Sequence, residues 1–326
     1  MLFSAVVGHQ RARDLLARSF THANVHTAYL FAGPPGVGKR LVAADFVRAL
    51  LCSEDDGAPC GLCDSCLLAG KLSHPDALVV APEEKKKTIS IEQVRALGAW
   101  LSQSPTYGSR KAAILDPADS LGAPAANALL KTLEEPPAGR VIILIAQRAG
   151  ALPPTVRSRC QQISFGALTD DEVAEVLRRN GWPAQSSCQA AALAEGSPGA
   201  ALERGGRGWQ EATESVHGLL AALAAGERGS ALAFAEAAGD PRERALAALR
   251  ALIGFSRLAV RQRLGDRSVA PDAVPALFGT MRSGQIGGLL AGALETHRRL
   301  EGDRPPNAKL ALATLLAAAG DAGVRQ

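Results

Sequence analysis

The sequence predicts an α/β domain with a parallel five-stranded sheet, followed by segments that are helical throughout. Two observations carry this prediction. Short β-type runs alternate with helical patterns in the first half of the chain, and no further β-type run follows Phe165. Strands that alternate with helices indicate a parallel sheet covered on both faces. A length of 326 residues is enough for two or three domains.

The five predicted strands are short apolar or β-branched runs. They are residues 28–32, 77–81, 112–115, 141–146 and 161–165. Between them, apolar residues at helical spacing predict one helix that includes residues 43–50 and another that includes residues 126–133. Pro136 and Pro137 end the second helix, because proline cannot continue the backbone hydrogen bonding.

The second half of the chain predicts helices only. Thr169 precedes three acidic residues, a pattern typical of a helix N-cap with an acidic first turn. The unit that begins there reaches about residue 205, where Gly-Gly-Arg-Gly at residues 205–208 predicts a break. An Ala/Leu/Arg-rich tail of amphipathic helices follows. We therefore expect domains over residues 1–165, 166–205 and 206–326.

Composition and charge are ordinary for a soluble globular protein. Hydrophobic residues make up 47% and charged residues 21%. The net charge of +4 is spread along the chain, which permits contact with nucleic acid but does not indicate it. Arg11 and Arg13 come too early for a secretory signal peptide, and the apolar run 141–146 is too short to cross a bilayer. We expect a cytoplasmic protein without membrane contact.

Residues 33–39 (Gly-Pro-Pro-Gly-Val-Gly-Lys) fit the phosphate-loop pattern G-x-x-x-x-G-K. Glycines let backbone N–H groups wrap a phosphate, the lysine adds a charge, and the following helix directs its positive end at the anion. The strand before the loop and the helix after it favour this interpretation over a chance glycine turn. The candidate nucleotide contacts are Gly33, Pro34, Gly36, Val37, Gly38, Lys39, Arg40 and Asp116.

Side chains that ATP hydrolysis needs are missing around this loop. Arg40 stands where the motif has Ser or Thr, whose hydroxyl binds the magnesium ion. Asp116 ends a predicted strand and is placed to hold magnesium through water, although it is also a common turn residue before proline. Pro117 replaces the usual catalytic Glu, and Asp119 would have to reach back to act as the base. Whether the loop holds ATP, ADP or phosphate without hydrolysis stays open.

Four of the six cysteines, Cys52, Cys60, Cys63 and Cys66, have the spacing C-x7-C-x2-C-x2-C. Four thiolates with no open position are typical of a structural zinc site. The spacing is less suited to an iron–sulfur cluster, and unligated cysteines are the remaining alternative. Cys160 and Cys188 stand alone, and we expect both to be buried as apolar residues.

Several motifs occur in an order that resembles one family. They are Val-Gly-His-Gln at residues 7–10, the phosphate loop, the cysteine cluster after its helix, residues 127–137 (Asn-Ala-Leu-Leu-Lys-Thr-Leu-Glu-Glu-Pro-Pro), and Ser-Arg-Cys at residues 158–160. The chain thereby resembles the AAA+ subunits of the bacterial DNA polymerase III clamp loader. The resemblance implies an AAA+ domain over residues 1–165, a helical lid over 166–205 and a helical collar for ring assembly over 206–326.

Within that family the chain resembles the delta-prime type rather than the gamma and tau motor subunits. Arg40 and Pro117 side with delta-prime, as does Gly199, which lies where a sensor arginine is expected. His-Pro-Asp at residues 74–76 is also similar to delta-prime. The resemblance implies a non-hydrolysing stator that helps load the sliding clamp onto primed DNA. Its partners would be the gamma/tau and delta subunits within the polymerase III holoenzyme, and it would have no ATPase or polymerase activity by itself.

The resemblance also implies a role for Arg159. In clamp loaders the arginine of the Ser-Arg-Cys element faces the ATP of the neighbouring subunit, where it neutralises charge on the transferred phosphoryl group. An ion pair within the chain is the alternative for Arg159, and Arg157 is the alternative finger. Two other functions stay open, namely a hydrolysing gamma/tau-like ATPase and a zinc-containing nucleic-acid-binding module with a vestigial phosphate loop.

Overall fold

The computed structural model describes residues 2–21, 24–54, 59–70, 73–84, 86–204, 207–227, 229–239, 242–266, 269, 274–302 and 305–324. The chain divides into two compact units, Met1–Leu168 and Thr169–Gln326. The second unit contains the predicted collar range, 206–326, and all of the predicted lid range except residues 166–168. None of the described helices is long and apolar enough to cross a membrane.

The first unit contains the predicted parallel five-stranded sheet, in the order β2-β3-β4-β1-β5. Its strands are β1 (Ala28–Ala32), β2 (Ala77–Val80), β3 (Lys111–Leu115), β4 (Arg140–Ala146) and β5 (Gln161–Ser164). Its α-helices are α1 (Gln10–Thr21), α2 (Lys39–Leu50), α3 (Asp64–Gly70), α4 (Ile91–Ser102), α5 (Ala123–Glu134) and α6 (Pro154–Arg157). The predicted fold class of this unit is confirmed.

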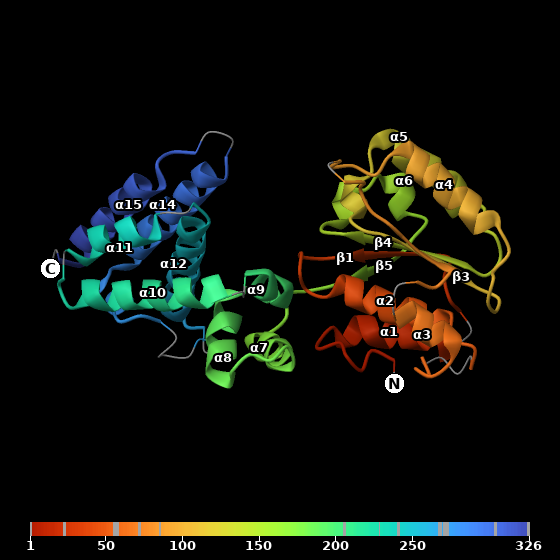
Figure 1. Cartoon of the computed structure of the whole chain (residues 1–326), viewed down its shortest axis with the longest axis horizontal. Coiled ribbons are helices and arrows are strands. Elements are labelled where there is room, and N and C mark those ends of the chain that lie inside the picture. Colours follow the sequence, from red (N-terminus) through yellow and green to blue (C-terminus); the bar gives the residue numbers. More distant parts are fainter. Residues whose placement is uncertain are drawn as a thin grey trace. The chain divides into compact units, whose positions relative to one another are not determined.

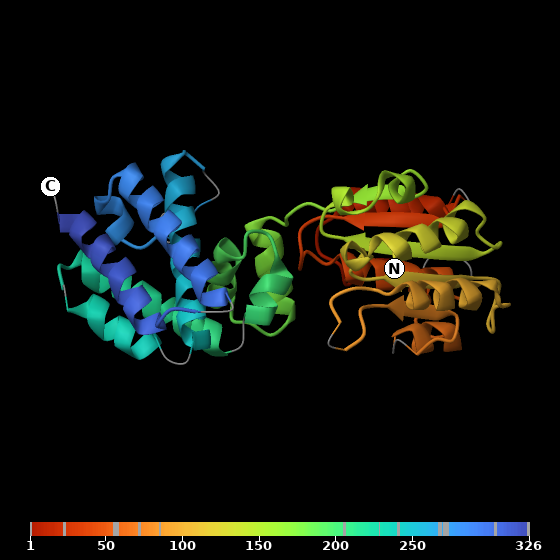
Figure 2. The same cartoon turned by 90° about the horizontal axis from the view of Figure 1, so that it is seen from above.

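Helices cover both faces of the sheet. Figure 1 shows α4, α5 and α6 on one face, with α1, α2 and α3 on the other, and Figure 2 shows the same sheet from above. β3, β4 and β1 are buried almost throughout, which explains why their sequences are continuous apolar runs rather than alternating ones. Because all five strands are parallel, the loops that follow them lie at one edge of the sheet.

The opposite edge of the sheet, where the strands begin, is fastened by buried charged groups. The Asp76 carboxylate is fully buried and accepts hydrogen bonds from the backbone N–H groups of Thr106 (2.8 Å) and Tyr107 (2.6 Å). Lys111 Nζ lies 4.0 Å from Asp76 Oδ1 and donates to the Trp100 carbonyl. Arg140 donates to the carbonyls of Leu101 and Gln103, at the end of α4. These contacts tie the loop between α4 and β3 to the sheet.

Among the described residues of the second unit, all the regular secondary structure is α-helical. Its helices are α7 (Asp170–Arg179), α8 (Ala184–Leu193), α9 (Pro198–Arg204), α10 (Arg207–Ala224), α11 (Ser230–Ala238), α12 (Arg242–Arg263), α13 (Leu277–Thr280), α14 (Ser283–Glu301) and α15 (Ala308–Val324). The predicted N-cap is present, since the Thr169 side chain accepts from Glu172 N and the Glu172 side chain accepts from Thr169 N. The predicted break over 205–208 is too long: residues 205–206 lie outside the described residues, but α10 already begins at Arg207.

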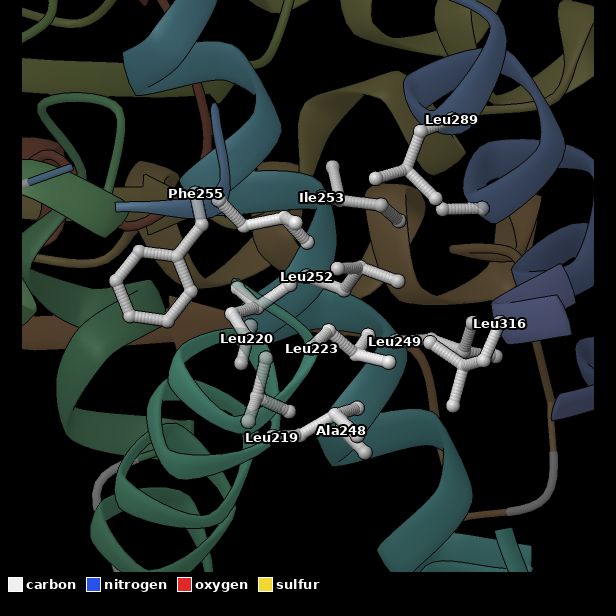
Figure 3. Close-up of a cluster of buried hydrophobic side chains, with 14 of the residues drawn as sticks. Leu219, Leu220, Leu223, Ala248, Leu249, Leu252, Ile253, Phe255, Leu289 and Leu316 are labelled. Carbon is white, nitrogen blue, oxygen red and sulfur yellow. The ribbon is translucent and has the colours of Figure 1, made fainter. Parts of the chain in front are cut away.

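One hydrophobic core joins helices α10 to α15 of the second unit. Figure 3 shows Leu219, Leu220 and Leu223 of α10 against Leu249 and Leu252 of α12, together with residues of α14 and α15. Leu193, at the end of α8, belongs to the same cluster. Its side chain lies so close to α12 that a Cβ on Gly254 would meet Leu193 Cδ2 at 2.6 Å. The predicted lid range therefore contacts the core of the collar range through Leu193 and its neighbours.

The buried contacts of Asp76 lead to a prediction about stability. Asp76→Ala removes the acceptor of two backbone N–H groups and leaves Lys111 buried without its carboxylate, so we expect a loss of about 3 kcal/mol. Urea denaturation combined with hydrogen exchange of the β2 and β3 amides measures it. Glu83→Ala, which removes an exposed ion pair with Lys86, is the control and should change little. Equal effects of the two substitutions would contradict the anchoring role.

His74 generates a prediction about pH. Burial lowers the pKa of His74 below its ordinary 6.5, with Asp76 opposing the shift, and its Nε2 has no hydrogen-bond partner among the described residues. The unfolded chain therefore takes up the proton first as the pH falls, and stability decreases below about pH 6.5. His74→Asn should flatten this decrease in urea midpoints between pH 8 and pH 5. An equally steep decrease in the variant would refute the assignment.

Candidate functional site

The predicted phosphate loop connects the carboxyl end of β1 to α2. Its first glycine sits against β5: a Cβ on Gly33 would lie 2.2 Å from the Phe165 carbonyl oxygen, so no larger residue fits. Gly36 and Gly38 have φ values of 71° and 102°, in the left-handed region that favours glycine. Gly33 N also donates to the Ala146 carbonyl of β4. The glycines thus hold a tight loop at the edge of the sheet, before the N-terminus of a helix of 12 residues.

Lys39 is buried at the start of α2, with 7% of its surface exposed. Its Nζ donates to the carbonyls of Gly33 and Pro34, both at 2.6 Å. Burial lowers the pKa of Lys39, and the nearby carboxylates Asp116 and Asp119 oppose that shift. An ammonium has three donors, so the described contacts leave one for a ligand.

Arg40 and Asp116 form an ion pair beside the loop. Arg40 Nη1 lies 3.6 Å from Asp116 Oδ2, and the two side chains are 55% and 20% exposed. Burial raises the pKa of the Asp116 carboxyl, while Arg40 and Lys39 pull it down. Magnesium prefers oxygen ligands, and a cation beside Asp116 would meet the guanidinium instead of a hydroxyl. The residues present therefore do not fit a magnesium ion.

Asp119, the possible replacement for a catalytic Glu, already accepts a hydrogen bond within the chain. Asp119 Oδ2 accepts a hydrogen bond of 2.6 Å from the backbone N–H of Gln147, the residue after β4. Pro117 carries no acid. Asp119 thus has a structural partner for one of its carboxylate oxygens.

His9 is a contact of the loop that the sequence analysis quoted only as part of a motif. Its Nε2 lies 2.7 Å from the Val37 carbonyl oxygen, and its ring packs edge-on against Phe165 at 4.9 Å. His9 has a φ of 54°. The signal that could have identified it is the histidine in an otherwise apolar segment directly before α1.

The structure brings the four clustered cysteines together. Cys52 follows α2, Cys66 lies in α3, and Cys60 and Cys63 come from the turn between them. The four sulfur atoms all lie within 4.8 Å of one another. The Cys52–Cys63 and Cys60–Cys66 sulfur pairs are 4.0 Å apart, far beyond a disulfide bond and close to the roughly 3.8 Å expected across a tetrahedral Zn–S₄ site.

Backbone N–H groups point at these sulfur atoms. Cys52 Sγ accepts from Cys60 N, Cys60 Sγ from Leu62 N and Cys63 N, and Cys63 Sγ from Cys66 N, at 3.3–3.5 Å. Burial opposes ionisation of Cys63, but hydrogen bonds from Ser53 and neighbouring groups outweigh it and lower the pKa to about 6. Such donors stabilise thiolates, so the residues fit a tetrahedral metal ion.

The remaining cysteines differ from expectation in one case. Cys160 is partly buried, its thiol donates to the Val156 carbonyl, and burial raises its pKa to about 11. Cys188 is exposed on α8, so the expectation that it is buried is wrong.

Arg159 lies on the turn after α6. Its guanidinium donates to Glu134 Oε1 at 2.6 Å and to the Thr155 carbonyl at 3.0 Å, and 36% of the side chain is exposed. The ion pair within the chain, which the sequence analysis held as an alternative, is therefore present in the isolated chain. Arg157 is less exposed, and its Nε is buried without a hydrogen-bond partner among the described residues.

The cysteine geometry predicts one bound metal ion per chain. Cys66→Ser should lower the metal content measured by mass spectrometry after gel filtration, because a hydroxyl is a poor replacement for the buried fourth thiolate. Cys188→Ser removes an exposed cysteine outside the cluster and should leave the metal content unchanged. A wild-type protein that is folded and free of metal would rule out the site.

Comparisons with known proteins agree on one family. A family model described as DNA polymerase III, delta subunit, matches residues 8–169. The chain is 39% identical over 194 residues to DNA polymerase III subunit delta' of Pseudomonas aeruginosa, an alignment that covers 58% of each chain. It is 32% identical over 267 residues to subunit delta' of Escherichia coli, covering 81% of this chain and 78% of that one.

A relative with a different subunit name is similar over a shorter range. DNA polymerase III subunit tau of Salmonella typhimurium is 34% identical over 176 residues, which covers 54% of this chain and 27% of the relative. The alignment with the Escherichia coli delta' subunit extends beyond the sheet-containing unit, whereas the tau alignment covers little more than half of the chain. The chain therefore belongs to the delta-prime family of bacterial DNA polymerase III subunits.

Proposed function

We propose that this chain acts in a DNA polymerase III clamp loader as a subunit that does not hydrolyse ATP itself but supplies Arg159 to the ATP site of a neighbouring subunit. Membership of the delta-prime family supports the clamp-loader role. Its partners would be the gamma/tau motor subunits and the delta subunit, and through them the sliding clamp and primed DNA. The observation that carries the non-hydrolysing role is the Arg40–Asp116 ion pair beside the phosphate loop.

Three features support the absence of hydrolysis. Arg40 pairs with the acid that would face the metal, Pro117 offers no base, and Asp119 is taken by Gln147 N. General-base and metal catalysis both need a positioned group, and none of these residues supplies one. A gamma/tau-like ATPase, the alternative, has in its favour the complete glycine loop and the buried Lys39. The glycine loop and Lys39 explain phosphate binding, however, and do not by themselves catalyse ATP hydrolysis.

The finger assignment to Arg159 draws on its exposure and on the energy of its ion pair. Arg159 is exposed, whereas Arg157 is partly buried. The Glu134 pair is a surface contact, worth up to about 1 kcal/mol. An arginine finger contributes roughly 10³-fold or more in rate, equivalent to about 4 kcal/mol. The transition state at a neighbour's ATP would therefore gain more from the guanidinium than breaking the pair with Glu134 costs.

We further propose that the metal held by Cys52, Cys60, Cys63 and Cys66 is a structural zinc ion. Four sulfur ligands leave no position open for substrate, which favours a structural over a catalytic role. Zinc would fasten the segment after α2, which carries the phosphate loop at its other end. A nucleic-acid-binding module is the weaker interpretation, because a net charge of +4 over 326 residues offers little electrostatic attraction to DNA.

If Arg159 acts as an arginine finger, its substitution should slow ATP hydrolysis at the neighbouring subunit. In a mixture of this chain with gamma/tau and delta subunits, clamp and primed DNA, Arg159→Ala should lower the ATP turnover that depends on this chain by about 10³-fold at the neighbouring site. The total rate would fall less if other sites in the ring continue to turn over, so single-turnover measurements are needed. Arg157→Ala is the matched control and should retain most of the activity if the protein remains folded.

Assembly must be verified in parallel, since a loss of activity has no meaning if the subunit no longer joins the ring. Gel filtration of the Arg159→Ala mixture should give the same complex as the wild type. Unchanged single-turnover hydrolysis in an intact Arg159→Ala complex would overturn the finger assignment.

A further inference from the structure

We infer that the phosphate loop binds a diphosphate group without a magnesium ion, with the Arg40 guanidinium in the place of the metal, and that ADP or ATP carries this group. The inference rests on the proposed non-hydrolysing role and names the ligand and the ionic form that such a site takes. It starts from the observation that Arg40 and Asp116, which bind each other, do not suit a magnesium ion.

The loop retains what is needed to hold phosphate. Gly36 and Gly38 turn the backbone through the left-handed region before α2, a conformation in which successive N–H groups form an anion-binding concavity. The Lys39 ammonium is nine-tenths buried, and the described residues use two of its three donors. The third donor of this buried cation is a second feature, independent of the helix N-terminus, that indicates an anionic ligand.

The metal position is taken by a charge of the chain itself. In a phosphate loop of the usual kind, the residue after the lysine and an acid at the end of another strand of the sheet hold the magnesium ion. Here those two positions are Arg40 and Asp116, and they bind each other at 3.6 Å. The guanidinium brings the positive charge that the metal would bring, together with donors that suit phosphate oxygens.

The charges around the loop favour a nucleotide without magnesium over a nucleotide bound to magnesium. Lys39 and Arg40 face Asp116 and Asp119, so these four side chains sum to zero before a ligand binds. A magnesium ion would add two positive charges beside a guanidinium and would have to displace it from Asp116. A nucleotide free of metal instead meets Lys39 and Arg40 directly. We therefore expect magnesium to compete for the nucleotide in solution and not to assist its binding.

Isothermal titration of the full chain with ADP in magnesium and in EDTA tests this directly. The affinity in EDTA should equal or exceed the affinity in magnesium. Lys39→Ala and Arg40→Thr should each weaken binding in EDTA by about tenfold or more, since each removes a charged donor to phosphate. Arg40→Thr also restores the hydroxyl and frees Asp116, so magnesium should now tighten binding by this variant.

Arg95→Thr is the matched control. Arg95 is exposed on α4, and its substitution makes the same change in net charge away from the loop, so its titrations should match the wild type. Parallel titrations with pyrophosphate and with inorganic phosphate distinguish a nucleotide site from a site for free phosphates. ADP binding tighter than pyrophosphate binding is the expected result.

Two results would overturn the inference. One is ADP binding by the wild-type chain that requires magnesium, and the other is no measurable binding of ADP in either buffer. Both are independent of ATP turnover in the assembled ring, so the failure of this inference and the failure of the Arg159 role are distinguishable.

Discussion

The parallel pairing of β1 with β4 on one side and β5 on the other is the constraint on which the site depends. Gly33 N donates to the last residue of β4, and Phe165 N donates to Ala32 at the end of β1, so the phosphate loop is fastened to both neighbours as it leaves the sheet. The close approach of Gly33 to the Phe165 carbonyl follows from this pairing. Because the strands run in one direction, Asp116 after β3 reaches the same edge as the loop.

At that edge two positively charged side chains, Lys39 and Arg40, lie near the carboxylate of Asp116. Lys39 keeps the position and burial of a phosphate-binding lysine, whereas Arg40 neutralises the acid that would serve the metal. The cysteine cluster and the phosphate loop lie at opposite ends of α2, so a metal held by the cysteines would steady the helix that carries Lys39. Arg159, on the exposed turn after α6, is paired with Glu134 in the isolated chain, and it is the side chain that we propose acts on a neighbouring subunit.

Much of this fold could be predicted from the sequence, because its strands are buried and its loops carry strong signals. The five strand predictions match the observed strands closely, since continuous apolar runs bounded by Gly, Pro and Asp are distinctive. The cysteine spacing likewise predicted the cluster. The ion pair between Arg40 and Asp116 could not be predicted, because motif spacing does not show where a long side chain points. For the same reason, the sequence could not show whether the Arg159 guanidinium is paired or free. Nor could it show that Asp119 accepts a hydrogen bond from Gln147 N.

The errors lie in the helical half, where local signals are weaker. Glycines at 205–208 suggested a longer break, but α10 begins at Arg207, and the apolar residues of this helix that enter the core lie further along it, from Val216 onward. Cys188 is exposed although isolated cysteines are commonly buried. The packing of Leu193 against Gly254 also left no sequence signal, since a glycine within a helix does not reveal which residue occupies its space.

We propose that this chain retains a phosphate loop without the means of hydrolysis. Phosphate release by the purified chain alone, with saturating ATP and magnesium, is the decisive measurement. We expect a rate indistinguishable from that of the Lys39→Ala variant. Sustained turnover by the wild type that Lys39→Ala abolishes would contradict it.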